Sequence, residues 1–558
     1  MKTLSFLLPL ALAAAGSIHP GAAAAPAAVP AAVPAAVAAQ HEHRELDATL
    51  HAPYRGDARG QPDARTFTLA FDHPGMTRGE VAWRLELLAP TGRRVGQWQG
   101  RQALAGGRPA SVAVRWRGLV GGARPAAGIY RVRLLARIGG EEVGQAWDIA
   151  VGTIAAPSMP PFAGLPTRRA PLRDTVQAAP APDGLPYTVY YGNLHSQTSH
   201  SDGGAPVDDC HGAQEPQSAP FGPDAAWPYA RRHGLDILMV SEHNHMYDGS
   251  TGTKTGADPL AAKALYRAGL DSARAFNAAH QDFLALYGLE WGVIGNGGHL
   301  NIFNTDELLG WEKTGKGELL ADVETARGDY GALYALMQRR GWIGQFNHPA
   351  LTGQFAVGGK ALAYTPEGDA AMALCEVMNS SAFSTSEDEE ETRRSNFEQA
   401  CNKLLEAGYH VAFSSNQDNH CANWGASAAN RTAVLVPNGV PLTRDSFVEA
   451  LRARRVFATM DKDAQLVLTA NGHLMGERFA NSGPLRLQVR FAGAPGRTAA
   501  AVEIVEGVPG RGGDVTTLPG KADVQLVPAP GPHFYYAKVT QDDGRILWSA
   551  PVWVDQSP

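Results

Sequence analysis

The central part of the chain, residues 187–461, alternates short apolar runs with segments that have a helical pattern. The apolar runs are DILMVS, FLALYG, HLNIF, WIGQF, ALCEVM and HVAFSS. Strands that alternate with helices predict βα units around a parallel sheet or barrel. This alternation therefore places the central part of the chain in the α/β fold class.

Four helices are expected in this region, over residues 258–280, 329–340, 390–407 and 444–454. The first begins with Asp258 as N-cap residue and Pro259 at the first helical position. Gly341 and Gly408 stand where a left-handed C-terminal cap is wanted. These start and stop signals fix the expected helix ends.

The flanking regions have a different pattern, because apolar and polar residues alternate there in short stretches such as TFTLAF and LRLQVRFAG, with turns between them. This pattern is typical of small antiparallel β-sandwich domains, immunoglobulin-like in the N-terminal case. The expected organisation has six parts in chain order: signal peptide 1–25, Ala/Pro-rich tether 26–44, β-domain 45–155, linker 156–186, catalytic domain 187–461 and β-domain 462–558.

The N-terminus indicates export. Lys2 precedes an apolar run over residues 4–15, and small residues follow near Ala22 and Ala25, as in a secretory signal peptide. The run is shorter than the roughly 20 residues that span a bilayer, and no later segment is long and apolar enough. We expect a periplasmic or secreted protein with no integral membrane segment after cleavage.

Composition limits the partners. The chain has 558 residues, more than one core usually supports, and a formal net charge of -6 without a polybasic segment, so nucleic acid is not expected as a partner. The oligomeric state is left open. Four cysteines in an exported chain favour disulfides, with three pairings open. We favour Cys210 with Cys421, because both lie just beyond candidate metal ligands.

A polar residue of a metal-binding type follows or opens nearly every apolar run of the central region, where α/β barrel enzymes build their sites. A single such residue is more often a surface or capping residue, but the joint pattern over about six runs is not explained in that way. Imidazole and carboxylate ligands suit divalent zinc, manganese or iron. The candidate ligands are His195, Gln197, Asp202, His243, Glu290, His299, His348, Asp418 and His420.

These segments resemble the motifs of the polymerase and histidinol phosphatase (PHP) superfamily of metallohydrolases. The similar segments are LHSQTSHSDG, ILMVSEHNH, LYGLEWG, FNHPA and DNH. Three further segments, NRTAVLV, ARRVFATMD and FYYAKVTQDDGRILWSAPVWV, resemble the exported CehA/McbA-like subgroup, which is similar to carbaryl hydrolase. The resemblance implies a distorted seven-stranded βα (TIM-like) barrel flanked by the two small β-sandwich domains, with two or three divalent metal ions.

Two residues depart from the superfamily pattern. Gln197 replaces the second histidine of the first motif, and its neutral amide oxygen is a weaker ligand for a transition metal than imidazole. Glu242 replaces the aspartate before His243, where the expected role is to hold a ligand imidazole through a hydrogen bond. One metal position is therefore expected to be weak or empty.

The expected activity is hydrolysis of a small-molecule ester, because a metal-bound water has its pKa lowered from 15.7 towards about 7. The resemblance to the superfamily favours phosphoester hydrolysis, and the resemblance to the subgroup favours carbamate or carboxylic ester hydrolysis as the alternative. An alternative of another class is a non-catalytic metal- or ligand-binding surface protein. Besides Glu242, the candidates for substrate contact or proton transfer are His200, His245 and Arg431. Four aromatic residues next to the motifs could line an apolar pocket: Trp291, Trp342, Phe346 and Trp424.

Overall fold

The computed structural model describes residues 46–56, 63–73, 76–105, 109–168, 185–294, 297–351, 353–389, 392–518 and 520–558, and every structural statement refers to these. The expected signal peptide and tether lie outside the described residues, as does most of the expected linker. Among the described helices, none is long and apolar enough to cross a membrane.

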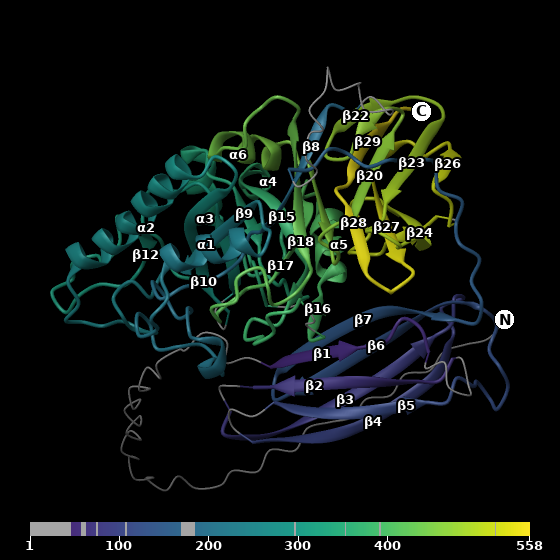
Figure 1. The fold of residues 1–558 in the computed structure, drawn as a ribbon, viewed down its shortest axis with the longest axis horizontal. Helices are drawn as coiled ribbons and strands as arrows, with labels where there is room; N and C mark the ends of the chain where they lie inside the picture. Colours follow the sequence, from purple (N-terminus) through teal and green to yellow (C-terminus); the bar gives the residue numbers. More distant parts are fainter. Residues whose placement is uncertain are drawn as a thin grey trace, which may run out of the picture. The chain divides into compact units, whose positions relative to one another are not determined.

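The N-terminal part of the described chain consists of two antiparallel sheets (Figure 1). One sheet has the order β1–β2–β5 and the other the order β4–β3–β6–β7. Alternate residues of these strands point into a shared apolar core, as Phe67, Leu69 and Phe71 do from β2. The bounds are β1 Asp47–His51, β2 Arg65–Asp72, β3 Arg78–Leu88, β4 Arg94–Ala105, β5 Ala110–Trp116, β6 Gly128–Ile138 and β7 Glu141–Val151.

The central part contains the expected parallel strands, because β8 pairs in parallel with β9, β9 with β10, β14 with β15, and β15 with β17. Strand β11 lies antiparallel between β10 and β14. All residues of β9, β10, β11 and β15 are buried, as expected for strands covered on both faces. The bounds are β8 Tyr187–Asn193, β9 Ile237–His243, β10 Leu284–Val293, β11 Gly298–Ile302, β12 Leu309–Gly310, β13 Val323–Glu324, β14 Gly344–Phe346, β15 Met372–Ser380, β16 Arg394–Asn396, β17 Ala412–Asn416, β18 Arg431–Pro437 and β19 Val456–Thr459.

Six α-helices accompany these strands among the described residues. Three of the expected helices form close to their predicted ends, and Asp258 and Asp329 cap two of them with their side chains. The helix expected from residue 390 begins only at Glu398, because the preceding segment forms the edge strand β16. The helix bounds are α1 Pro223–Arg232, α2 Pro259–Ala279, α3 Tyr330–Arg340, α4 Pro366–Ala371, α5 Glu398–Ala407 and α6 Arg444–Arg452.

The predicted fold class, a helix-ringed seven-stranded barrel between two separate β-sandwiches, is wrong. Strands account for 41% and helices for 15% of the structure, so it is mainly a β-protein. Among the described strands, β17 pairs only with β15, and β8 instead pairs with β18, from which the ladder continues through β19 to β28, β27 and β24. The C-terminal strands therefore extend the central sheet, and their backbone groups find partners there.

The C-terminal part supplies the rest of this 16-stranded sheet and a second sheet with the order β21–β20–β23–β26. Figure 1 shows these strands in yellow-green and yellow. The bounds are β20 Gln465–Ala470, β21 His473–Leu474, β22 Arg478–Asn481, β23 Leu485–Ala492, β24 Ala499–Gly507, β25 Thr516–Thr517, β26 Asp523–Leu526, β27 Gly531–Gln541, β28 Ile546–Ser549 and β29 Val552–Gln556.

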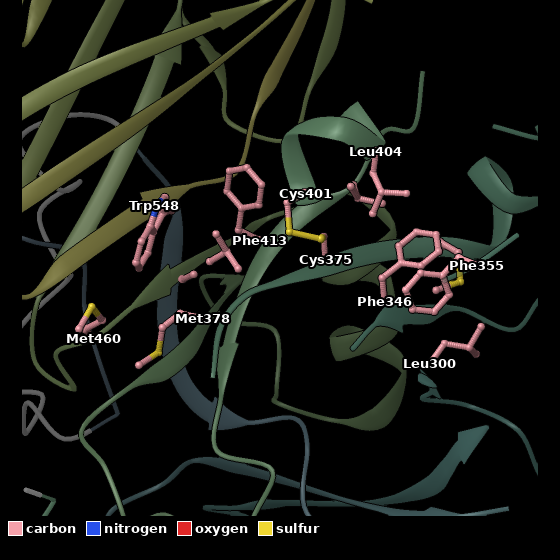
Figure 2. Close-up of a cluster of buried hydrophobic side chains, with 14 of the residues drawn as sticks. Leu300, Phe346, Phe355, Cys375, Met378, Cys401, Leu404, Phe413, Met460 and Trp548 are labelled. Carbon is pink, nitrogen blue, oxygen red and sulfur yellow. A yellow bond between two sulfur atoms is a disulfide. The ribbon is translucent and has the colours of Figure 1, made fainter. Parts of the chain in front are cut away.

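One apolar core runs behind the strands that carry the polar motif residues. Figure 2 shows part of it, from Leu300 and Phe346 past the Cys375–Cys401 disulfide to Phe413 and Trp548. These side chains come from β11, β14, β15, α5, β17 and β28. The core therefore fixes the strands whose ends carry the motif residues.

Candidate metal centre

The candidate metal ligands gather where several neighbouring strands end. His243 is the last residue of β9, while His195, His348 and Asp418 each follow two residues after a strand, namely β8, β14 and β17. Glu290 lies within the buried strand β10. Because these strands are parallel neighbours or share a neighbour, their carboxyl ends meet on one side of the sheet, and side chains distant in sequence come together.

A first group of possible ligands consists of His195, Glu290 and His348, whose candidate ligand atoms lie within 4.8 Å of one another. Nε2 of His195 is 2.9 Å from Oε2 of Glu290 and 3.1 Å from Oδ1 of Asp418. Nε2 of His348 is 3.5 Å from Oε1 of Glu290. The spacing leaves room for a cation between donors that would all face it.

Two further groups are linked to the first group, one directly through Glu290 and the other through His243. Asp202, His243 and His420 form one, with Oδ1 of Asp202 3.7 Å from Nε2 of His243 and 3.5 Å from Nε2 of His420. His243, Glu290 and His299 form the other, with Nδ1 of His299 3.0 Å from Oε1 of Glu290. Glu290 and His243 therefore connect all three groups, as expected for adjacent cations that share ligands.

The donor set fits metal ions. Among the described residues, no hydrogen-bond donor reaches either carboxylate oxygen of Asp202, although the side chain is only 1% exposed. A buried carboxylate without donors is costly unless a cation meets it. Together with the imidazoles of His243 and His420, these oxygens form a set of nitrogen and oxygen ligands that suits a divalent transition metal.

Gln197 lies inside the centre, where the sequence places it. Its Nε2 donates hydrogen bonds to Oε2 of Glu290 and to the backbone oxygen of Ser241. Its Oε1 is buried and receives no hydrogen bond from a described residue. The amide orientation that satisfies Nε2 therefore leaves Oε1 as an available, weak ligand atom.

The charges of the centre act on one another. Burial alone would raise the pKa of Glu290, but the neighbouring imidazoles of His195, His299 and His243 lower it well below its usual value. Burial likewise opposes the charged form of His195, yet Asp418, Glu290 and Glu376 raise its pKa well above its usual value. The carboxylate of Glu290 is thus held ionised, which is the form that binds metal.

Glu242 does not have the contacts expected of it. Its carboxylate accepts hydrogen bonds from the backbone N–H and the hydroxyl of Thr198 and from the hydroxyl of Ser201, and no imidazole is among these donors. Burial raises the pKa of Glu242, and the hydrogen bonds from Ser201 and Thr198 oppose this rise only in part. The resulting pKa is about 8. Its structural effect is to hold the loop that precedes Asp202.

Two residues expected at the centre lie elsewhere. Nδ1 of His200 is 2.7 Å from the hydroxyl of Tyr287, which points towards α2, on the face of β10 opposite Glu290. Arg431 donates to the backbone oxygens of Ala428, Asn430 and Gly425 and pairs with Glu389. The hydrogen bonds described for these two side chains go to partners other than the candidate ligands.

His245 remains beside the centre. Its ring centroid lies 5.9 Å from that of His243, and it stacks on Trp311 at 5.7 Å. Glu312 follows Trp311 in the chain and was not among the predicted site residues. Burial raises its pKa and the charge of His245 opposes this rise in part, so that the pKa is about 7. A buried acid facing an imidazole is a pair suited to proton transfer.

Two supporting residues were outside the predicted site. Oε1 of Glu376 lies 3.2 Å from Nδ1 of His195, on the side of the ring away from Glu290. Asn347 donates to Oε1 of Glu290 at 2.9 Å. Their positions in the sequence could have identified both residues. Glu376 lies in the run ALCEVM, and Asn347 directly precedes His348.

A cavity of about 990 Å³ adjoins the centre, lined there by His348, Asn379, Phe383 and Asp418. The four aromatic residues expected to line a pocket do not line this cavity. All four are buried in the core, where Trp291 packs on Tyr330 and the indole N–H of Trp424 donates to the backbone oxygen of Gln197.

The predicted pairing of Cys210 with Cys421 is confirmed, with an S–S distance of 2.02 Å, and the other two cysteines form a second disulfide. The first bond joins the loop after Asp202 to the loop that carries His420. An isolated β-bridge between Ala205 and Cys421 adds to this connection. Two loops that supply ligands to one group are therefore tied together.

No protein-family model and no curated protein matches the sequence. Solved structures that are similar include the putative ApaA protein from Bordetella pertussis, at 12% identity over 20% of this chain and 97% of that chain, with a TM-score of 0.15. A putative beta-galactosidase from Bacteroides fragilis has 10% identity over 92% and 74% of the two chains, with a TM-score of 0.15.

Beta-glucuronidase 2 from Bacteroides uniformis has 10% identity over 92% of this chain and 61% of its own length, with a TM-score of 0.14. At such scores, a likeness carries no argument about fold or activity. The functional argument rests on the geometry of the centre.

Proposed function

We propose that the protein is a metal-dependent hydrolase of ester bonds, with phosphoesters as its substrates. The observation that carries the proposal is the linked arrangement of three His/Asp/Glu groups through Glu290 and His243 at the strand ends. The segments that resemble motifs of the PHP superfamily supply six of these seven ligand residues, and the seventh, His299, opens the run HLNIF. Linked groups of this kind suit two or three divalent ions, with zinc, manganese or iron as the candidates.

When bound, the metal ions supply the Lewis acidity that lowers the pKa of an attacking water and offsets charge that develops on the substrate. The residues of the chain have three roles in this proposal. The imidazoles and carboxylates would hold the ions, Glu290 would contribute to two of the three ligand groups, and His245 would move a proton at the edge of the centre. No serine or cysteine nucleophile is required.

We expect a substrate with little negative charge, because most cations that line the cavity are already paired. The lining includes Arg84, Arg131, Arg133, Arg393 and Lys538. Of these, Arg84 and Arg133 pair with Glu86, and Arg131 and Lys538 pair with Asp148. A phosphomonoester dianion would therefore depend mainly on the metal ions for countercharge, whereas a phosphodiester carries one charge less. An aryl carbamate remains the alternative substrate, because the four aromatic residues expected to form an apolar wall do not line the cavity, but Phe383, Phe397 and Tyr536 do.

The test combines elemental analysis of the purified protein with hydrolysis of bis-p-nitrophenyl phosphate, p-nitrophenyl phosphate and a naphthyl carbamate. We expect two or three bound metals and turnover that is fastest on the diester and disappears on chelation. His243→Ala and Asp418→Ala should lose metal and hydrolysis together, because each removes a ligand.

Other outcomes would contradict the proposal in different ways. Turnover of the carbamate alone would favour a carbamate or carboxylic ester hydrolase. Bound metal without turnover of any ester would favour a metal-binding surface protein. If both alanine variants hydrolysed the ester as fast as the unaltered protein, these residues would not form the active site.

A further inference from the structure

The carboxylate of Glu376 is fully buried in β15, behind one of the three ligand groups. Its Oε1 lies 3.2 Å from Nδ1 of His195 and also accepts a hydrogen bond from Nδ2 of Asn416 at 3.0 Å. Its Oε2 accepts from the backbone N–H of His348 at 2.8 Å and from Nδ2 of Asn379 at 3.2 Å. One carboxylate thus contacts two members of the group His195, Glu290 and His348.

The contact with His195 determines which ring nitrogen faces the centre. A carboxylate accepts a hydrogen bond, so the contact with Glu376 keeps a proton on Nδ1 and leaves Nε2 as the nitrogen that a metal ion would bind in place of a proton. Nε2 is the atom that lies 2.9 Å from Glu290 and 3.1 Å from Asp418. Glu376 therefore fixes both the tautomer and the ring orientation needed for binding through Nε2.

The contact with His348 acts on the backbone. His348 has φ of 27°, in the left-handed region that a residue with a Cβ rarely adopts. The hydrogen bond from its N–H to Glu376 helps to hold this conformation. The conformation places Nε2 of His348 3.5 Å from Glu290.

The hydrogen bonds and ion pairs described for the second group, Asp202, His243 and His420, do not include Glu376. We propose that Glu376 is the positioning residue for the metal position formed by His195, Glu290 and His348, and that the position of Asp202, His243 and His420 forms without it. The proposal rests on the metal centre of the proposed function.

The test is a comparison of Glu376→Gln with the unaltered full-length protein. Metal content is measured after equilibration with graded zinc, and visible spectra are recorded after cobalt substitution. We expect one metal equivalent to bind 10- to 100-fold more weakly, and one component of the cobalt spectrum to disappear while the rest persists. Glu376→Asp, which keeps the carboxylate, should recover part of the lost binding.

Glu406→Gln is the matched control. Glu406 is also buried, at 2% exposure, but its oxygens accept hydrogen bonds from the backbone N–H groups of Val508 and Arg511. Removing its charge should leave metal content and the cobalt spectrum unchanged. This control separates loss of a buried carboxylate from loss of the contact with His195.

The outcomes distinguish this inference from the proposed function. Unchanged metal binding in both Glu376 variants would overturn the inference alone. If Glu376→Gln weakened the binding of every metal ion equally, the inference would be wrong, because both ligand groups would then depend on Glu376. Absence of metal from the unaltered protein under all conditions would overturn the proposed function and the inference with it.

Discussion

Gln197 is held in one orientation by two hydrogen bonds from its Nε2, to Glu290 and to the backbone of Ser241. Its Oε1 is buried and receives no hydrogen bond from a described residue. A neutral amide oxygen donates less electron density to a transition metal than an imidazole nitrogen does. The metal next to Gln197 should be the most weakly held.

We expect Gln197→His to raise the metal content of the purified protein, since it replaces a weak ligand with a strong one. Gln197→Leu, which removes the ligand atom but keeps similar volume, should lower it. Elemental analysis after dialysis against a fixed chelator concentration measures both. If the histidine and leucine variants retain equal amounts of metal, Gln197 is not a ligand position.

Some candidate ligands lie on strands and others lie on the loops that follow strands. Buried strands such as β10 place Glu290 rigidly, whereas Asp202, Asp418 and His420 lie on loops. Asp418 has φ of 52°, so its loop is held in a conformation that costs free energy. The Cys210–Cys421 disulfide joins this loop to the one after Asp202.

This disulfide closes a loop with a sequence separation of 211, and the chain-entropy relation gives it about 5 kcal/mol of stabilisation. We expect Cys210→Ser/Cys421→Ser to lower the melting temperature and to weaken metal binding by Asp202, His243 and His420. Thermal unfolding with and without zinc would measure both effects. An unchanged zinc affinity would show that the tether contributes to folding but not to the geometry of the centre.

Three distant parts of the chain meet at one buried lysine. The ammonium of Lys538 on β27 lies 3.0 Å from Asp148 on β7 and 3.2 Å from Glu398 on α5, and its side chain is 4% exposed. Burial alone would raise the pKa of Asp148, but Lys538 and Arg131 lower it below its usual value. The N-terminal sheet is therefore joined to the rest of the described chain by paired charges.

We expect Lys538→Met to destabilise the protein by about 3–5 kcal/mol at pH 7, because two carboxylates lose their buried partner. The folded pKa of Asp148 is below its unfolded value, so its stabilising effect is complete above about pH 4 and is lost as the pH falls towards the folded pKa. The deficit of the variant should therefore shrink in acid. Urea unfolding at pH 7 and pH 3 would measure it.

Lys313→Met is the control for this prediction. Lys313 pairs with Glu324 at 2.7 Å, but the side chains are 43% and 59% exposed, so the change should cost less than about 1 kcal/mol. Equal losses in the two variants would contradict the role assigned to the buried pair.

The sequence alone was sufficient for features that depend on local order. Cap residues such as Asp258 and Asp329 determine helix starts within a few residues, and polar residues after apolar runs identified all seven members of the three ligand groups. The Cys210–Cys421 pairing also followed from position, since each cysteine lies just beyond a ligand. Such features need only neighbouring residues in the chain.

Tertiary structure decided which strand ladders form and which side chains meet. The pattern of βα units is the same whether the strands close into a barrel or continue, through β18 and β19, into the C-terminal strands. His200 and Arg431 have side chains that could act in a site, but in the structure His200 contacts Tyr287 and Arg431 pairs with Glu389. Pairing and facing depend on contacts between distant residues, and no local pattern encodes them.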